Sequence, residues 1–222
     1  PGAVRLGPDG LLYIASGDAV VNMLPGAPRT GTIVRIDPDR VAPAPRIVAR
    51  GLGMPNGLTF DSAGRLYVAD GNLGVLRIGP TGAVDERWSA HAPKNLAPSR
   101  VANGTGINGI MAVDGDLFVT LTVSGTGRVL RVPIAAPGAT SVAADITRPL
   151  PGVLDDLASL DRRTLAVTTP TGQLAFVDLV TGSVCSTTVG QPVTAVAVRP
   201  GRGEQLMLSA ESGEILAVTV RR

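Results

Sequence analysis

The side chains best suited to chemistry recur at one position, directly before an apolar strand, in successive parts of the chain. Asn56 stands in Pro-Asn-Gly, Asn108 in Ile-Asn-Gly, Asp155 and Asp156 in Leu-Asp-Asp, and Thr194 in Val-Thr-Ala. Together they offer amide, carboxylate and hydroxyl oxygens without histidine or cysteine. Such ligands suit a hard divalent cation, Ca²⁺ first and Mg²⁺ or Mn²⁺ next. The alternative is that Asn-Gly and Asp simply form turns, which they favour in any protein.

These residues occupy equivalent positions because the chain repeats about every 40–50 residues. The stretch 55–70, PNGLTFDSAGRLYVAD, shows the unit: a turn, an apolar strand, a turn at 61–64, and a strand that ends on an acid. The second strand of each repeat carries a leucine in register: Leu12, Leu66, Leu117, Leu165 and Leu206. A third strand follows in every repeat. A fourth is expected in the first four, at 46–52, 83–90, 139–146 and 182–189.

Short strands repeated at this interval predict an all-β fold, a β-propeller of four-stranded antiparallel blades with five repeats visible. The innermost strand of each blade starts beside the central channel, so the residues before it should converge at the channel mouth. No window has sustained helical periodicity, and we expect almost no helix. We interpret residues 1–222 as a single propeller domain. The last repeat ends without a fourth strand, so the ring either has one incomplete blade or lacks an N-terminal blade or strand.

Composition narrows the function classes. Of the 222 residues, 44% are hydrophobic but only 3% aromatic, and the formal net charge is +2. Scattered lysines and arginines with few aromatics argue against nucleic-acid binding. No apolar run reaches the roughly 18 residues of a membrane span. The single cysteine, Cys185, excludes an intrachain disulfide, and its place in an apolar strand predicts a buried thiol.

The start of the chain bears on location. It begins at Pro1 and not at Met, which a removed signal peptide would explain. We therefore expect a secreted or periplasmic protein, and a cytoplasmic one remains an alternative.

Other chemistries have less support. His91 is the only histidine and no Gly-x-Ser-x-Gly motif is present, which argues against a Ser-His-Asp triad. The long connections at 17–29 and 87–106 exceed ordinary hairpin loops. Since functional loops gather at propeller mouths, these two are candidates for contacting a ligand.

Three motifs resemble one known family. PNGLTFDSAGRLYVAD, GINGIMAVDGDLFVT with GRVLRVPI, and LPGVLDDLASLD are similar to the SMP-30/gluconolactonase family and the related strictosidine-synthase-like propellers, over roughly residues 50–215. The resemblance implies six blades and a divalent cation held in the channel by a Glu, Asn residues and an Asp. By position, Asn108 resembles the metal-binding Asn, and Asp155 the metal-binding Asp that also serves as base. Asn56 resembles an Asn that touches metal or substrate.

The chain departs from the family in two places. The family opens its first blade with Glu-Gly-Pro, and nothing equivalent precedes Ala3. Asp156 stands where the family prefers Gly, so either acid could face the channel. We expect Asn56, Asp156 and Thr194 to contact a small-molecule substrate or ligand.

Three functions stay open at this point. The first is a divalent-cation-dependent hydrolase of small lactones or esters, in which Asp155 activates water. The second is a propeller that binds a ligand or protein without chemistry. The third, suggested only by the strictosidine-synthase side of the resemblance, is a condensation or cyclisation enzyme. The sequence does not predict the oligomeric state.

Overall fold

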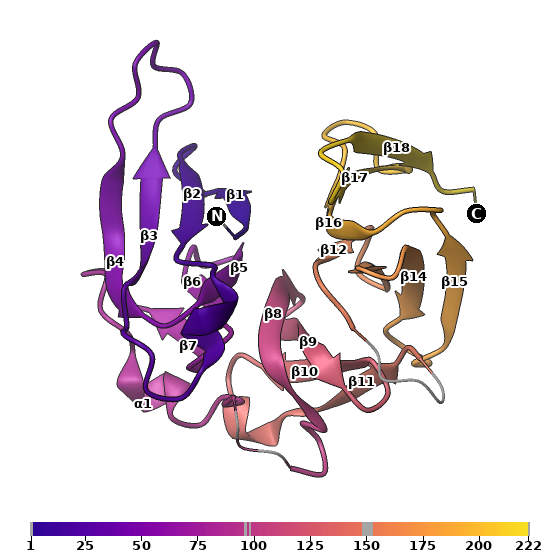
Figure 1. The fold of residues 1–222 in the computed structure, drawn as a ribbon, viewed down its shortest axis with the longest axis horizontal. Coiled ribbons are helices and arrows are strands. Elements are labelled where there is room, and N and C mark those ends of the chain that lie inside the picture. Colours follow the sequence, from indigo (N-terminus) through magenta and orange to yellow (C-terminus); the bar gives the residue numbers. More distant parts are fainter. Residues whose placement is uncertain (1, 96, 98, 148–152, 222) are drawn as a thin grey trace.

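The computed structural model describes residues 2–95, 97, 99–147 and 153–221 of the chain. Its strands form five antiparallel sheets that follow one another around a common centre, as a five-bladed β-propeller (Figure 1). The colours in Figure 1 run around this arrangement in sequence order, from the indigo first sheet to the yellow last one. The predicted all-β propeller is therefore confirmed.

The strands of each sheet pair in sequence order. The first sheet contains β1 (Val4–Leu6), β2 (Leu12–Ser16), β3 (Gly31–Ile36) and β4 (Arg46–Leu52). The second contains β5 (Pro55–Phe60), β6 (Leu66–Asp70) and β7 (Gly74–Ile78). The third contains β8 (Gly104–Val113), β9 (Asp116–Ser124), β10 (Arg128–Pro133) and β11 (Ser141–Asp145). The fourth contains β12 (Leu157–Ser159), β13 (Thr164–Thr169), β14 (Gln173–Asp178) and β15 (Val184–Thr188), and the fifth β16 (Val193–Val198), β17 (Gln205–Ala210) and β18 (Ile215–Thr219).

Helix is confined to short turns, as predicted: η1 (Val20–Met23), α1 (Glu86–Ser89) and η2 (Pro137–Ala139). The strand predicted at 83–90 is wrong, because this segment forms α1. Asp85 caps the helix by accepting the backbone N–H of Trp88 at 3.1 Å. The Trp88 ring then packs edge-on against Tyr67, with ring centroids 5.2 Å apart. The cap and the buried aromatic pair favour a helical turn over a fourth strand.

Aspartates close the turns between the first and second strands. Asp61 accepts the N–H groups of Ala63 and Arg65 at 3.0 and 2.9 Å, and the Tyr67 hydroxyl at 3.0 Å. Burial raises the pKa of Asp61, but the hydrogen bonds from Arg65 and Tyr67 outweigh it and hold the pKa below its usual range. Asp9 and Asp161 accept backbone N–H groups in the same way in the first and fourth blades. These local bonds explain why Asp recurs at this point of the repeat.

The core lies between the sheets. Each pair of neighbouring sheets, from the first to the fifth, encloses one apolar cluster. Alternate residues of a central strand serve two clusters: Leu66 and Val68 pack toward the first sheet, and Tyr67 and Ala69 toward the third. Both faces of such a strand are buried, so its sequence is apolar throughout and does not alternate.

The side between the fifth and first sheets differs. Within the described residues it holds a hollow of about 320 Å³, lined in part by Val4, Arg5, Met207 and Ile215. Val4 is 49% and Ile215 62% exposed, so these apolar side chains do not close the gap. A polar contact joins the first sheet to the fourth blade: Arg5 Nη2 lies 3.3 Å from Asp156 Oδ1.

Cys185 is exposed, so the expectation of a buried thiol is wrong. It lies in β15, the outermost strand of the fourth sheet, where most side chains face solvent. Apolar composition alone does not distinguish an outermost strand from an inner one.

Every helix within the described ranges is too short to cross a lipid bilayer.

Asp70, at the end of β6, joins the first two blades. Its side chain is fully buried and accepts four backbone N–H groups, from Gly53, Met54, Asn72 and Leu73, at 2.9–3.0 Å. Gly53 and Met54 belong to the connection that leaves the first sheet. A single carboxylate therefore satisfies backbone donors on both sides of the junction, which an apolar residue could not do.

We expect Asp70→Asn to lower the free energy of unfolding by about 2 kcal/mol or more. Three of the four N–H groups point at Oδ1, so the new amide nitrogen would face the N–H of Gly53 and leave that buried donor unsatisfied. Urea denaturation followed by circular dichroism measures the change. Asp39→Asn, on an exposed turn, is the matched control and should change stability by less than about 0.5 kcal/mol. Equal effects of the two substitutions would contradict this role of Asp70.

Candidate functional site

Three of the candidate residues occupy equivalent positions in their blades, as the strand pairing shows. The innermost strands β5, β8 and β16 each shift register against the second strand of their blade. The shifts contain Asn56, Asn108 and Thr194, respectively. Such β-bulges redirect a side chain and are common next to active sites. In these three blades the motif expected before the innermost strand is thus a bulge within that strand, and not only a turn.

Glycines let the innermost strands touch along the axis. A Cβ on Gly57, which follows Asn56, would collide with the backbone oxygen of Asn108. A Cβ on Gly109 would lie 2.7 Å from the backbone oxygen of Asp155. Contacts this close are possible only for residues without a side chain. The second, third and fourth blades therefore bring Asn56, Asn108 and Asp155 to neighbouring positions at one end of the propeller.

Asn108 is the most constrained of the candidates. It is 7% exposed, and its Nδ2 donates to Thr122 Oγ1 at 2.8 Å. Its side chain also hydrogen-bonds Asp155 and so favours the charged form of that carboxyl. Asn108 Oδ1 is buried and, among the described residues, is the one buried side-chain N or O atom without a hydrogen-bond partner. A buried carbonyl oxygen without a donor is costly unless something else binds it.

Two threonines hold the acidic pair in place. Thr120 Oγ1 accepts the N–H of Gly109 at 2.8 Å and donates to the backbone oxygen of Asp155. Thr168 Oγ1 accepts the N–H of Asp156 at 3.2 Å. Sequence reasoning missed both threonines. The signal was present, since each stands three residues after the registered leucine of its repeat, where the first two repeats have alanine.

Asp155 lies in an acidic environment. Burial, followed by the charges of Asp156 and Asp18, raises the pKa of Asp155 to about 7, and Glu211 adds to the effect. The hydrogen bond from Asn108 opposes this rise. Asp18 follows β2 and Glu211 follows β17, so the connections of the first and fifth blades add negative charge near Asp155. The mouth of the propeller therefore attracts cations.

Asp156 has partners for both carboxylate oxygens. Oδ1 lies 3.3 Å from Arg5 Nη2, and Oδ2 accepts the N–H of Val196 at 3.2 Å. Burial raises the pKa of Asp156, whereas Arg5 and the N–H of Val196 lower it. Asp156 thus links the fourth blade to the first and the fifth. Of the two adjacent acids, Asp155 is the one that hydrogen-bonds Asn108.

Asn56 and Thr194 are half-buried at their bulges. The backbone oxygen of Asn56 accepts the N–H of Ala3 at 2.8 Å, which joins the first and second blades. Contact of either side chain with a substrate stays a prediction, as does that of Asp156.

The connection at 17–29, one of the two predicted ligand loops, lies over the second and third blades. Met23 packs near Gly71, which follows β6, and Gly106, which lies near the start of β8. Asn72 Nδ2 donates to the backbone oxygens of Asn22 and Leu24 at 2.7 and 3.0 Å. The loop is therefore anchored near the start of β8, the strand that contains Asn108.

The donor set can be compared with what a metal ion needs. Within the described ranges, no group of three or more His, Cys, Asp or Glu side chains is arranged to hold a metal. The predicted set differs from such a group, because it combines one carboxylate with amide oxygens. The buried, unpartnered Asn108 Oδ1 beside Asp155 fits a hard cation, with water completing the shell.

No protein-family model matches the sequence, and no curated protein matches it. Solved structures do share the fold across 99% of this chain. A predicted gluconolactonase aligns at 16% identity over 76% of its own length, with a TM-score of 0.64. The PQQ-bound aldose sugar dehydrogenase of Streptomyces coelicolor aligns at 19% over 80%, with a TM-score of 0.62. An inactive virginiamycin B lyase of Staphylococcus aureus, solved with quinupristin, aligns at 13% over 70%, with a TM-score of 0.61. These likenesses establish the propeller fold.

We expect Gly109→Ala to destabilise the protein by about 1–3 kcal/mol. The new methyl group would lie 2.7 Å from the backbone oxygen of Asp155 and 2.9 Å from Asp156 Cα, so the third and fourth blades must move apart. Gly203→Ala is the control, because a Cβ there meets no atom within 4 Å. Denaturant midpoints of both variants measure the difference. A Gly109→Ala protein as stable as the control would contradict the axial packing.

The raised pKa of Asp155 predicts a pH-dependent stability. Between about pH 4 and pH 7 the folded protein holds a proton that the unfolded chain has released, so stability falls as the pH rises through this window. In the presence of a chelator, we expect Asp155→Asn to raise the melting temperature at pH 8 by on the order of 5 °C. The gain should vanish near pH 4. Melting curves at both values test this, and a gain of equal size at both pH values would count against it.

Proposed function

We propose that this propeller binds a divalent cation, Ca²⁺ first, at Asn108 and Asp155, and hydrolyses small lactones or esters at the channel mouth. The observation that carries the proposal is the buried Asn108 Oδ1, which has no hydrogen-bond partner among the described residues, on a side chain that hydrogen-bonds Asp155. An oxygen in this position is preorganised to bind an electrophile.

The chemistry of the donors favours a hard cation. Asn108 offers an amide oxygen and Asp155 a carboxylate, and Asn56 lies one blade away. Asp18 and Glu211 add negative charge near Asp155 without forming a three-carboxylate cluster. Ca²⁺ accepts six to eight oxygen ligands in irregular geometry, so it tolerates such a mixed set better than Mg²⁺ does.

When bound, the cation would polarise the carbonyl group of the substrate. The residues of the chain have separate tasks. Asn108 is oriented by its bond to Thr122, and Thr120 fixes the backbone of Asp155. Asp155, in its charged form, accepts a proton from water as the water oxygen bonds to the carbonyl carbon. The bond from that carbon to the ring or ester oxygen then breaks, and Asp155 returns the proton to the departing oxygen.

The structural neighbours suggest which substrates to test first. One is a predicted gluconolactonase and another an aldose sugar dehydrogenase. Both names refer to sugars or their lactones, so a substrate panel should begin with sugar lactones and extend to simple esters.

A second candidate function is ligand binding without chemistry. It is favoured by the absence, within the described ranges, of a metal-binding group of three or more His, Cys, Asp or Glu side chains. In this case the mouth would bind a small cationic molecule through Asp155 and its acidic neighbours.

Calcium titration by calorimetry beside a lactone-opening assay tests the proposal. We expect Asp155→Asn to abolish both calcium binding and hydrolysis, because neutral oxygens alone do not offset the water lost by the ion. Asn108→Ala should weaken calcium binding at least about tenfold. Glu214→Gln, an exposed carboxylate on the last hairpin, is the matched control and should change neither.

Each result separates the two functions. Calcium binding that survives in Asp155→Asn and Asn108→Ala would remove the metal site. Calcium binding by the native chain without hydrolysis across the panel would leave the binding function. Circular dichroism confirms that each variant is folded.

A further inference from the structure

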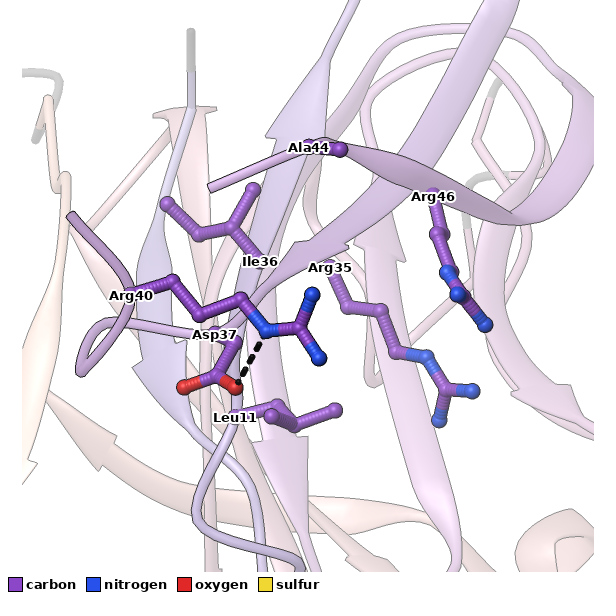
Figure 2. A pocket seen from close by; sticks show the side chains of 7 residues that line it. All are labelled: Leu11, Arg35, Ile36, Asp37, Arg40, Ala44 and Arg46. Carbon is purple, nitrogen blue, oxygen red and sulfur yellow. Dashed lines mark hydrogen bonds and ion pairs between the residues drawn. The ribbon is translucent and has the colours of Figure 1, made fainter. Parts of the chain in front are cut away.

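A second hollow lies in the first sheet, at the end away from the mouth. It has a volume of about 200 Å³ and is lined by Leu11, Arg35, Ile36, Asp37, Arg40, Ala44 and Arg46 (Figure 2). These residues come from the position just before β2, the end of β3, the β3–β4 connection and the start of β4. Figure 2 shows the Arg40 side chain above Asp37 and Leu11, with the side chains of Arg35 and Arg46 to the right of them.

Two of these arginines are paired across the sheet. Arg35 of β3 and Arg46 of β4 are direct partners in the antiparallel register. Side chains directly opposite each other share one face and lie close together, so like charges there are destabilising. Arg40, on the connection, adds a third positive charge to the same hollow.

The carboxylates nearby neutralise only part of this charge. Asp37 Oδ2 lies 3.3 Å from Arg40 Nε, and Asp9 Oδ2 lies 3.4 Å from Arg35 Nη1. Asp39 is on the same turn but does not line the hollow. Within the described residues, Arg46 is in no salt bridge. Three guanidinium groups therefore share two carboxylates.

Three arginines at this end of other blades are paired more tightly, whereas Arg162 lies 3.5 Å from Asp114. Arg65 lies 2.6 Å from Asp61, Arg131 lies 2.5 Å from Asp116, and Arg163 lies 2.7 Å from Asp178. Each of these pairs has one cation and one anion at short distance. Compared with these three pairs, the contacts of Arg35 and Arg40 are longer, and Arg46 is in no salt bridge within the described residues.

We propose that this hollow binds a small tetrahedral oxyanion, as free phosphate or as the phosphoryl group of a small organic molecule. Guanidinium groups present planar pairs of N–H donors that match phosphate oxygens. A doubly charged anion between Arg35, Arg40 and Arg46 would offset their repulsion. Leu11 and Ile36 form an apolar edge that could lie against the rest of a phosphorylated molecule. The site shares no residue with the candidate metal site.

Thermal unfolding and calorimetry at low ionic strength test the proposal on the native chain, Arg46→Ala and Arg50→Ala. Arg50 is an exposed arginine of the same strand that does not line the hollow, so it is the matched control. We expect inorganic phosphate to raise the melting temperature of the native chain and of Arg50→Ala. Arg46→Ala should bind phosphate at least tenfold more weakly. Without phosphate, Arg46→Ala should be no less stable than the native chain, because a repulsive pair is gone.

The anions added distinguish the two sources of the ligand. Glycerol phosphate that binds as tightly as inorganic phosphate would support a phosphorylated molecule, and tighter binding of inorganic phosphate would support the free ion. Sodium chloride at matched ionic strength controls for screening. An equal effect of chloride and phosphate, or equal phosphate binding by Arg46→Ala and Arg50→Ala, would overturn the proposal.

Discussion

The candidate site depends on the close contact of the innermost strands at the propeller axis. The backbone oxygens of Asn108 and Asp155 each occupy the space that a Cβ would need on a glycine of the preceding blade. This packing leaves no room for side chains between the strands, so polar groups at the bulges must point toward the mouth or toward their own blade. Gly57 and Gly109 are needed for steric reasons, whereas the polar residues next to them supply the groups that could do chemistry.

Crowded backbone at a bulge also creates polar groups that the sheet ladder does not satisfy. Thr120 and Thr168 hydroxyls accept N–H groups of Gly109 and Asp156, and Asp70 does the same for four N–H groups at another junction. Within the described residues, every buried side-chain N or O atom but one has a hydrogen-bond partner. Asn108 Oδ1 is the exception, and the same side chain hydrogen-bonds the Asp155 carboxylate of the next blade. A single buried polar atom without a hydrogen-bond partner, where all others have one, indicates a ligand more strongly than a cluster of acids at the mouth does.

The sequence was sufficient to predict the fold and the equivalent positions of Asn56, Asn108 and Thr194 in their blades, for a physical reason. Turn residues and apolar strands are local signals, and their repetition reported the blades without any tertiary information. Local signals gave wrong predictions where another local structure was more favourable, or where the place of a strand in its sheet decided the exposure of its side chains. Asp85 capped a helix where a strand was predicted, and Cys185 lay on an outermost strand. Thr120 and Thr168 were missed because their role follows from the bulge opposite them.

The two ends of the propeller carry different chemistry despite a formal net charge of only +2. Asp155 is half-buried near Asp156, Asp18 and Glu211 at the mouth, while Arg35 and Arg46 face each other across two strands at the far end of the first sheet. Composition could not reveal this separation, since strand register decides which charges meet. Because the strands span the sheet from one end to the other, each blade carries its charges at two distant places. A cation at one end and an oxyanion at the other would therefore interact only weakly, and each site can be tested on its own.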